Sequence, residues 1–308
     1  MLKPRSLSLP ILSTRLTAIL QAVFVTFLWS TSWVLIKIGL RNDLPAITFA
    51  GLRYALAWLC LVPFVLLKAE HRAALKKLSR GEWVSLALLG VFTYAITQSL
   101  QYLGLAFLPA AMLSLLLNLT SAFVAFGGVW WLREQPSTLQ WIGLVLTVAG
   151  VLLYFLPIQL PRAQVIGIVI ALGCMFGNVI ASLLGRNVNR SAIHSPLLVT
   201  FVSMGVGSVL MLGFGAAVQG FGSLTWTDWF IIAWLALVNT AFAFTLWNKT
   251  LRTLTAIESS VINSLMMPQI AILALVFLGE GLTLKEIFGL VLVGLGVLIV
   301  QLQRRRNG

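Results

Sequence analysis

The sequence consists almost entirely of apolar runs separated by short polar gaps, and most runs are long enough to cross a lipid bilayer as a helix. A hydrocarbon core of roughly 30 Å needs about 20 apolar residues per helix. Of the 308 residues, 59% are hydrophobic and 9% are charged, whereas soluble domains contain about 25% charged residues. The chain is therefore predicted to be an all-α membrane protein with about ten transmembrane helices and no separate soluble domain.

Charged residues, Pro, Gly and Asn mark the ends of the predicted helices. The third and fourth helices are divided at Pro109, because the gap between them carries no charge and proline is typical of a first helical turn. The predicted helices are 16–40, 45–67, 83–104, 109–132, 138–157, 164–185, 195–218, 227–249, 255–278 and 284–303.

The net charge of +13 does not indicate nucleic-acid binding, because the basic residues lie in the gaps between apolar runs rather than on a basic face with binding motifs. Lys and Arg favour the cytoplasmic side of membrane proteins. Sixteen of the 21 basic residues lie in the N-terminal segment, in every second gap and in the tail 304–308, and three lie in the other gaps. Both termini of this multi-pass cell-membrane protein (inner membrane, in bacteria) are therefore predicted to be cytoplasmic. Because the first apolar run continues to Leu40, it is expected to be a retained helix rather than a cleaved signal.

The two halves of the chain repeat one another at an interval of 146 residues. This shift superimposes residue types that rarely match by chance in apolar sequence: Glu134 on Glu280, Gly143 on Gly289 and Gly150 on Gly296. Each half holds five predicted helices, so the second half must enter the membrane in the opposite orientation. We predict an inverted five-plus-five repeat, with a first unit at 1–157, a second at 162–303 and a basic cytoplasmic tail at 304–308.

Residues suited to enzyme chemistry or metal binding are scarce in the sequence. Cys60 and Cys174 lie in apolar runs without a partner at ligand spacing, and His71 and His194 lie in predicted loops. The sequence contains no phosphate-binding loop, nucleophile elbow or pair of carboxylates. The chain is therefore predicted not to be an enzyme and to need no cofactor or metal.

Inverted repeats are common in secondary transporters, which bind substrate between the halves near the membrane midplane. The chain resembles the EamA-type members of the drug/metabolite transporter superfamily in segments that include FLWSTSWVLIKIGL, LPAITFAGLRYAL, WWLREQPSTLQWIGLVLTVAGVLLY and VFLGEGLTLKEIFGLVLVGLGVLIV. The resemblance implies ten helices and a cavity lined mainly by helices 1, 3, 4, 6, 8 and 9. Many such proteins export amino acids or related metabolites, and some import choline or other solutes. The family often has proline in both the fourth and ninth helices, where this chain has Ala122 and Pro268.

Candidate substrate-binding residues are mainly the polar and aromatic side chains that the predicted helices place near the middle of the membrane. An amide in hydrocarbon must find a partner, so each one either faces a wet cavity or bonds to another polar group. Trp29 and Trp33 either form an aromatic surface for a partly apolar or cationic ligand or pack in the core. The candidates are Trp29, Trp33, Lys37, Tyr94, Gln98, Asn118, Asn178, Asn239, Asn263 and Gln269.

Lys37 and Arg53 are predicted to lie at similar depth within the first two helices, where a charge costs about 2.5 to 3.5 kcal/mol. They either form a positive mouth for a substrate carboxylate, or reach out to the membrane surface, or contact backbone carbonyls between helices 1 and 2. Arg53 is the weaker candidate, because the resemblance makes helix 2 peripheral. The sequence places no carboxylate near a midplane, so facilitated diffusion or exchange is at least as well indicated as ion coupling. Pro268 removes a helical hydrogen bond and is expected to free the carbonyl of Ser264.

Together these features favour a secondary transporter that moves small polar or amphipathic metabolites, above all amino acids, outward by alternating access around a midplane cavity. Two alternatives stay open at this point: an importer of choline-like or other nutrient solutes, and a non-transporting membrane scaffold. The expected partners are a small-molecule substrate and the lipid bilayer, with no nucleic acid, and the protein is expected to be a monomer or a homodimer.

Overall fold

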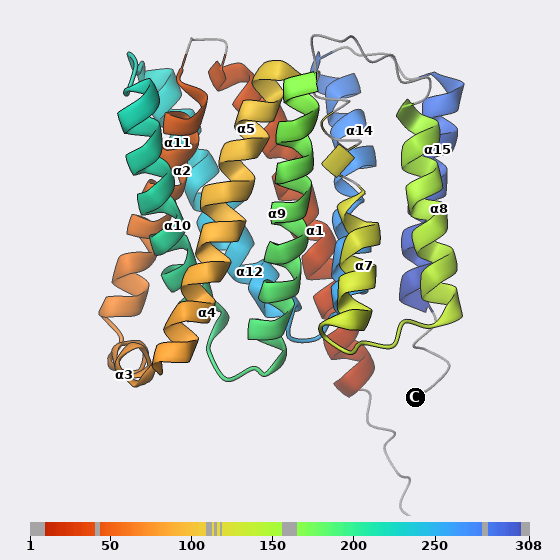
Figure 1. Ribbon diagram of the computed structural model, residues 1–308, viewed down its shortest axis with the longest axis horizontal. Helices are drawn as coiled ribbons and strands as arrows, with labels where there is room; N and C mark the ends of the chain where they lie inside the picture. The colour runs from red at the N-terminus through yellow and green to blue at the C-terminus, as the bar shows by residue number, and fades with distance from the viewer. Residues whose placement is uncertain are drawn as a thin grey trace, which may run out of the picture.

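The structure, a computed structural model, is a bundle of helices that run side by side (Figure 1). It describes residues 10–40, 44–108, 113, 116–117, 119–155, 165–278 and 283–302. Within these ranges the regular elements are all helices: α1 (Pro10–Leu40), α2 (Ala46–Leu66), α3 (Ala69–Lys77), α4 (Arg80–Gly90), η1 (Val91–Ile96), α5 (Thr97–Phe107), α7 (Thr120–Trp130), α8 (Thr138–Phe155), α9 (Val165–Arg190), α10 (Pro196–Gln219), α11 (Trp226–Ala236), η3 (Leu237–Phe242), α12 (Ala243–Thr250), α13 (Ala256–Asn263), α14 (Met266–Leu278) and α15 (Leu284–Leu302).

Six helical stretches in the described part of the chain are long and apolar enough to cross a membrane: Thr14–Ile36, Ala46–Leu66, Arg80–Gly104, Val165–Arg190, Pro196–Gln219 and Trp226–Thr250. Shorter apolar helices lie at Thr120–Trp130, Thr138–Leu153 and Ile287–Gly296. The prediction of an all-α membrane protein is confirmed. The full set of ten spans stays a prediction, because part of the predicted fourth helix, 109–132, lies outside the described residues.

One short helix, α3, lies outside the predicted set. It occupies the gap between the second and third predicted helices, none of its residues is buried, and its sequence AEHRAALKK is too polar to cross a membrane. α3 lies at the end of the bundle where α1 begins and α15 ends, at the bottom of Figure 1. We call this the basal end, and the distribution of Lys and Arg predicts that it faces the cytoplasm.

The third and eighth predicted spans each contain a π-helical segment, η1 and η3. The two segments are 146 residues apart, which is the interval of the sequence repeat. π-Helical turns are rare, and they often occur at functional sites. Tyr94 in η1 and Asn239 and Thr240 in η3 are all buried, so both segments place polar or aromatic groups in the middle of the bundle.

The predicted ninth helix is interrupted at Ser264 and Leu265, between α13 and α14. The expectation that Pro268 frees the Ser264 carbonyl is wrong. That carbonyl accepts a hydrogen bond from the backbone N–H of Met267, with 3.2 Å between nitrogen and oxygen. A tight turn therefore satisfies the group that the proline would otherwise leave unpaired.

The helices α8 and α15, which end the two predicted halves, pack along each other (Figure 1). A Cβ atom built on Gly150 of α8 would lie 2.6 Å from the carbonyl oxygen of Gly289 and 2.8 Å from the nitrogen of Val293. No side chain fits at that distance. The glycines that recur in the sequence repeat therefore allow two backbones to approach closely.

Candidate functional site

A cavity of about 210 Å³ lies inside the bundle, between helices of the first half and helices of the second. One water molecule needs about 10–15 Å³, so the cavity has room for a small solute. Most of its lining comes from α1, α2, η1, α5 and α7 on one side and from α9, α12, α13 and α14 on the other. Transporters built from inverted repeats bind their substrates in this place.

Six aromatic side chains line the cavity, and five of them contact one another in a cluster that we call the aromatic wall: Trp29, Tyr54, Tyr94, Phe244 and Trp247. The ring centroid of Trp29 lies 4.9 Å from that of Phe244 and 5.1 Å from that of Trp247. The ring centroids of Tyr94 and Phe244 lie 5.0 Å apart. The indole N–H of Trp29 also donates a hydrogen bond to the Asn239 carbonyl, at 3.2 Å. These contacts hold the rings in place, so the wall offers a firm surface to the apolar part of a ligand.

Uncharged polar side chains supply much of the remaining lining. They include five amides and a group of serines around the break in the ninth helix: Gln98, Gln101, Asn178, Asn248, Asn263, Ser259, Ser260 and Ser264. Among the described lining residues, the only charged side chain is that of Arg53. The cavity therefore combines an aromatic surface, many neutral hydrogen-bonding groups and one cation.

Six of the ten predicted binding residues line this cavity: Trp29, Trp33, Tyr94, Gln98, Asn178 and Asn263. They come from helices that are far apart in the sequence, and the fold brings them together. Asn263 is exposed although it lies in the middle of the predicted ninth helix, because it borders the cavity. A role of these six residues in substrate binding stays a prediction.

Two further predicted residues, Asn239 and Gln269, bind α1 instead of lining the cavity. The amide nitrogen of Asn239 lies 3.0 Å from the Ser32 hydroxyl. The side-chain oxygen of Gln269 lies 2.9 Å from the Ser30 hydroxyl, and its nitrogen lies 3.3 Å from that of Thr26. These bonds give partners without a ligand to the Gln269 amide and to the nitrogen of Asn239, whereas the buried side-chain oxygen of Asn239 has none among the described residues.

The last two predicted residues cannot be placed in the same way. Lys37 lies in the final part of α1, but its side chain falls outside what the structure describes. Asn118 lies outside the described residues altogether.

Arg53 reaches the cavity from α2, a helix that the resemblance makes peripheral. Its Nε donates a hydrogen bond to the Thr240 hydroxyl at 2.8 Å, and its guanidinium carbon lies 5.2 Å from the ring centroid of Tyr54. Both Arg53 and Tyr54 line the cavity. The second helix therefore contributes a charged and an aromatic group to the candidate site, which the resemblance did not lead us to expect.

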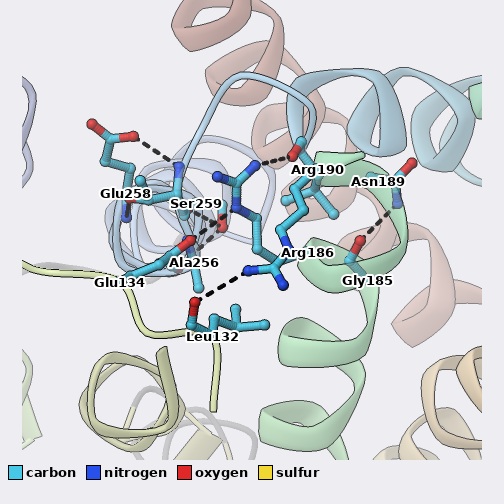
Figure 2. A network of polar contacts seen from close by, with 11 residues as sticks. Leu132, Glu134, Gly185, Arg186, Asn189, Arg190, Ala256, Glu258 and Ser259 are labelled. Carbon is cyan, nitrogen blue, oxygen red and sulfur yellow. Dashed lines mark hydrogen bonds and ion pairs between the residues drawn. The ribbon is translucent and has the colours of Figure 1, made fainter. Parts of the chain in front are cut away.

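An ion pair joins the first half of the chain to the second (Figure 2). Glu134, which follows α7, accepts a hydrogen bond from Arg186 of α9 at 2.9 Å. Its other carboxylate oxygen accepts the backbone N–H of Ala256, at the start of α13, at 3.0 Å. Arg186 also donates to the Leu251 carbonyl at 2.7 Å. One carboxylate of the first half thus holds two segments of the second half.

A second ion pair joins α1 to α13. Nη2 of Arg15 lies 2.6 Å from Oε1 of Glu258, whose side chain is fully buried. The other oxygen of Glu258 accepts the backbone N–H of Thr255 at 2.8 Å and so caps α13. We call the Arg186–Glu134 and Arg15–Glu258 ion pairs the basal seal. Residues next to them in the sequence or bonded to them line the cavity: Gly185, Leu251 and Ser259.

Part of the aromatic wall escaped the sequence analysis, although the repeat contained a signal for it. Phe244 and Trp247 lie 146 residues after Gln98 and Gln101, and all four line the cavity. Applying the repeat interval to the predicted residue Gln98 would therefore have identified Phe244. Within the described residues, no group of three or more His, Cys, Asp or Glu side chains is arranged to hold a metal ion.

Comparison with known proteins supports this architecture. The profile of the EamA-like transporter family matches residues 16–156 and residues 165–302. A Bacillus subtilis protein named "Uncharacterized transporter YvbV" is 28% identical over 92% of this chain and 91% of its own length. An Escherichia coli protein named "Probable amino-acid metabolite efflux pump" is 24% identical over 90% of this chain and 92% of its own. A crystal structure at 14% identity matches with a TM-score of 0.74, over 96% of this chain and 99% of the other, which shows the fold alone.

Proposed function

Because the chain belongs to the EamA-like transporter family, we propose that it carries small amino-acid-like metabolites outward across the membrane by alternating access through the cavity. The family and its relatives make the protein a membrane transporter. The substrate class, the direction and the mechanism are our proposal. We further propose that the units 1–157 and 162–303 are inverted repeats, which the 146-residue spacing of η1 and η3 supports.

One observation supports the proposed substrate class: in the cavity, the aromatic wall lies beside neutral polar groups and a single arginine. An amino acid with an apolar side chain presents a matching apolar part and polar part. A choline-like cation would also suit an aromatic wall, but Arg53 would repel it. A non-transporting scaffold gives no reason for a polar cavity in the middle of the bundle, since burying polar side chains without hydrogen-bond partners is costly.

The basal seal supports alternating access. Both of its ion pairs join the first half of the chain to the second, so the halves cannot part at the basal end unless these pairs separate. In the conformation described here both ion pairs at that end are formed. If the basal end is cytoplasmic, an exporter must break the seal to load substrate and form it again before release. No Asp or Glu lies among the described lining residues, which favours exchange or facilitated diffusion over ion coupling.

The experiment is transport by the purified protein in liposomes, with a panel of labelled amino acids and amines. We expect at least one amino acid with an apolar side chain to move faster than through protein-free liposomes. Trp29→Ala should slow that transport about tenfold, because it removes the centre of the aromatic wall. Trp130→Ala is the matched control, since Trp130 is 90% exposed on the outside of α7.

Two outcomes would contradict the proposal. If no amino acid moved above background, the substrate class would be wrong. If only quaternary amines moved, the choline-like alternative would replace it. Direction would follow from cells: an exporter raises resistance to excess substrate, whereas an importer supports growth on it.

A further inference from the structure

We propose that Arg53 binds the carboxylate of the transported molecule and so makes the cavity selective for solutes with one negative group. This inference rests on the proposed function and adds to it the residue that reads the charge of the substrate. It is carried by the position, the hydrogen bonds and the unbalanced charge of the Arg53 side chain.

The guanidinium of Arg53 is buried at the cavity wall, where the residue is 3% exposed. Its Nε has one good hydrogen bond, to the Thr240 hydroxyl at 2.8 Å. Its Nη2 lies 3.5 Å from both the Ser32 hydroxyl and the Asn239 carbonyl, which is the long limit for a hydrogen bond. Within the described residues no hydrogen bond of Nη1 meets the distance and angle limits, although the buried Tyr102 hydroxyl lies close enough to interact with the guanidinium. The π-helical segment η3 therefore holds the group from one side and leaves donors for a ligand.

In the described part of the chain, the charge of Arg53 also has no carboxylate partner. The ion pairs of the described residues join Arg15 to Glu258 and Arg186 to Glu134, and two more involve histidines; none includes Arg53. An uncompensated buried charge is unfavourable by several kcal/mol, and unpaired charges inside membrane proteins usually mark a substrate path. Arginine binds carboxylates and phosphates through two parallel hydrogen bonds, so an anionic group of the substrate fits this side chain.

The surroundings restrict the ligand further. One guanidinium balances one negative charge, so a carboxylate suits this site better than a phosphate dianion, and a cation is repelled. The Tyr54 ring, 5.2 Å from the guanidinium carbon, belongs to the aromatic wall. A ligand bound by its carboxylate at Arg53 can therefore lay an apolar group along that wall. This arrangement describes an amino acid or a related acid with an apolar side chain.

The test compares acids with their amides, which have nearly the same shape but lack the negative charge. L-Phenylalanine, L-leucine and L-methionine, each with its amide, are offered to the full-length protein in liposomes. The variants are Arg53→Met, Arg53→Lys and the control Arg72→Met, which removes an exposed arginine of α3. We expect the wild type and the control to transport acids at least about tenfold faster than amides, a ratio that Arg53→Met should abolish. Arg53→Lys should keep part of it, since lysine retains the charge but not the two-pronged geometry.

An acid preference that survives in Arg53→Met would overturn the inference while leaving amino-acid transport intact, and so would equal transport of acids and amides by the wild type. If Arg53→Met does not fold, Arg53→Lys decides: an unchanged preference overturns the inference and a reduced one supports it. If the wild type transports neither form of any compound, the proposed function fails and this inference falls with it.

Discussion

A methyl group added at Gly150 tests whether α8 and α15 are held at the close approach that the structure shows. In Gly150→Ala, the new Cβ would lie 2.6 Å from the carbonyl oxygen of Gly289, about 0.8 Å inside the 3.4 Å at which ordinary contact begins. The opposing atoms belong to backbone, so no side chain can rotate away. The two helices would have to separate along their shared face.

The loss in free energy of unfolding caused by Gly150→Ala is estimated by comparison with a second glycine of the same helix pair. Overpacking a close contact costs about 1–3 kcal/mol, whereas replacing glycine by alanine inside a helix gains up to about 1 kcal/mol. Gly294 on α15 has no atom within 4 Å of its built Cβ, so Gly294→Ala should show the gain without the cost. The difference between the two variants therefore isolates the overpacking, about 1–3 kcal/mol.

Thermal unfolding in detergent measures this difference. Cys174 is fully buried whereas Cys60 is only partly buried, so in a Cys60→Ala background a fluorogenic thiol reagent reports the loss of structure without an added probe. We expect Gly150→Ala to unfold at a lower temperature than the wild type, and Gly294→Ala at the same or a slightly higher temperature. Equal unfolding temperatures for the two variants would refute the close approach of α8 and α15.

The remaining predictions concern the basal seal and the cavity. Glu134→Ala leaves Arg186 and the Ala256 N–H without their partner, and removing one member of a buried ion pair costs about 3–5 kcal/mol, the upper limit for this partly exposed pair. Thermal unfolding of the single and double variants with Arg186→Met should show coupling between the two positions, and additive effects would contradict the contact. In a chain with Cys60 and Cys174 replaced by alanine, a cysteine at position 263 should react with a water-soluble thiol reagent much faster than one at position 239, because Asn263 borders the cavity and Asn239 is buried against α1. Comparable labelling rates would show that the cavity is misplaced.

The fate of the predicted amides shows how far sequence reasoning reaches into the site. Asn263 and Gln269 both lie in the middle of the same predicted helix, and both satisfy the argument that a polar group in lipid must find a partner. The break at Ser264 separates them, so that Asn263 faces the cavity and Gln269 faces α1. No property of either residue alone distinguishes the two outcomes, because the partner comes from a distant segment.

Arg53 illustrates the same limit from the opposite direction. A charged side chain inside an apolar run is costly and therefore rare, so the sequence alone marks Arg53 as a residue with a specific role. Whether it reaches the membrane surface or the cavity depends on η3, which supplies its best hydrogen bond from 187 residues further along the chain. The contact between α2 and η3 was needed to assign Arg53 to the cavity.

Length and spacing of the apolar runs, taken by themselves, determined the helical membrane fold, since a bilayer demands only enough apolar residues to span it and internal hydrogen bonds for the backbone. The recurring glutamate and glycines likewise pointed to a duplicated chain. The tertiary structure alone decided which polar groups meet in the cavity, which bond to one another, and which buried cation has no carboxylate partner in the described part of the chain, because those outcomes depend on contacts between helices far apart in the sequence.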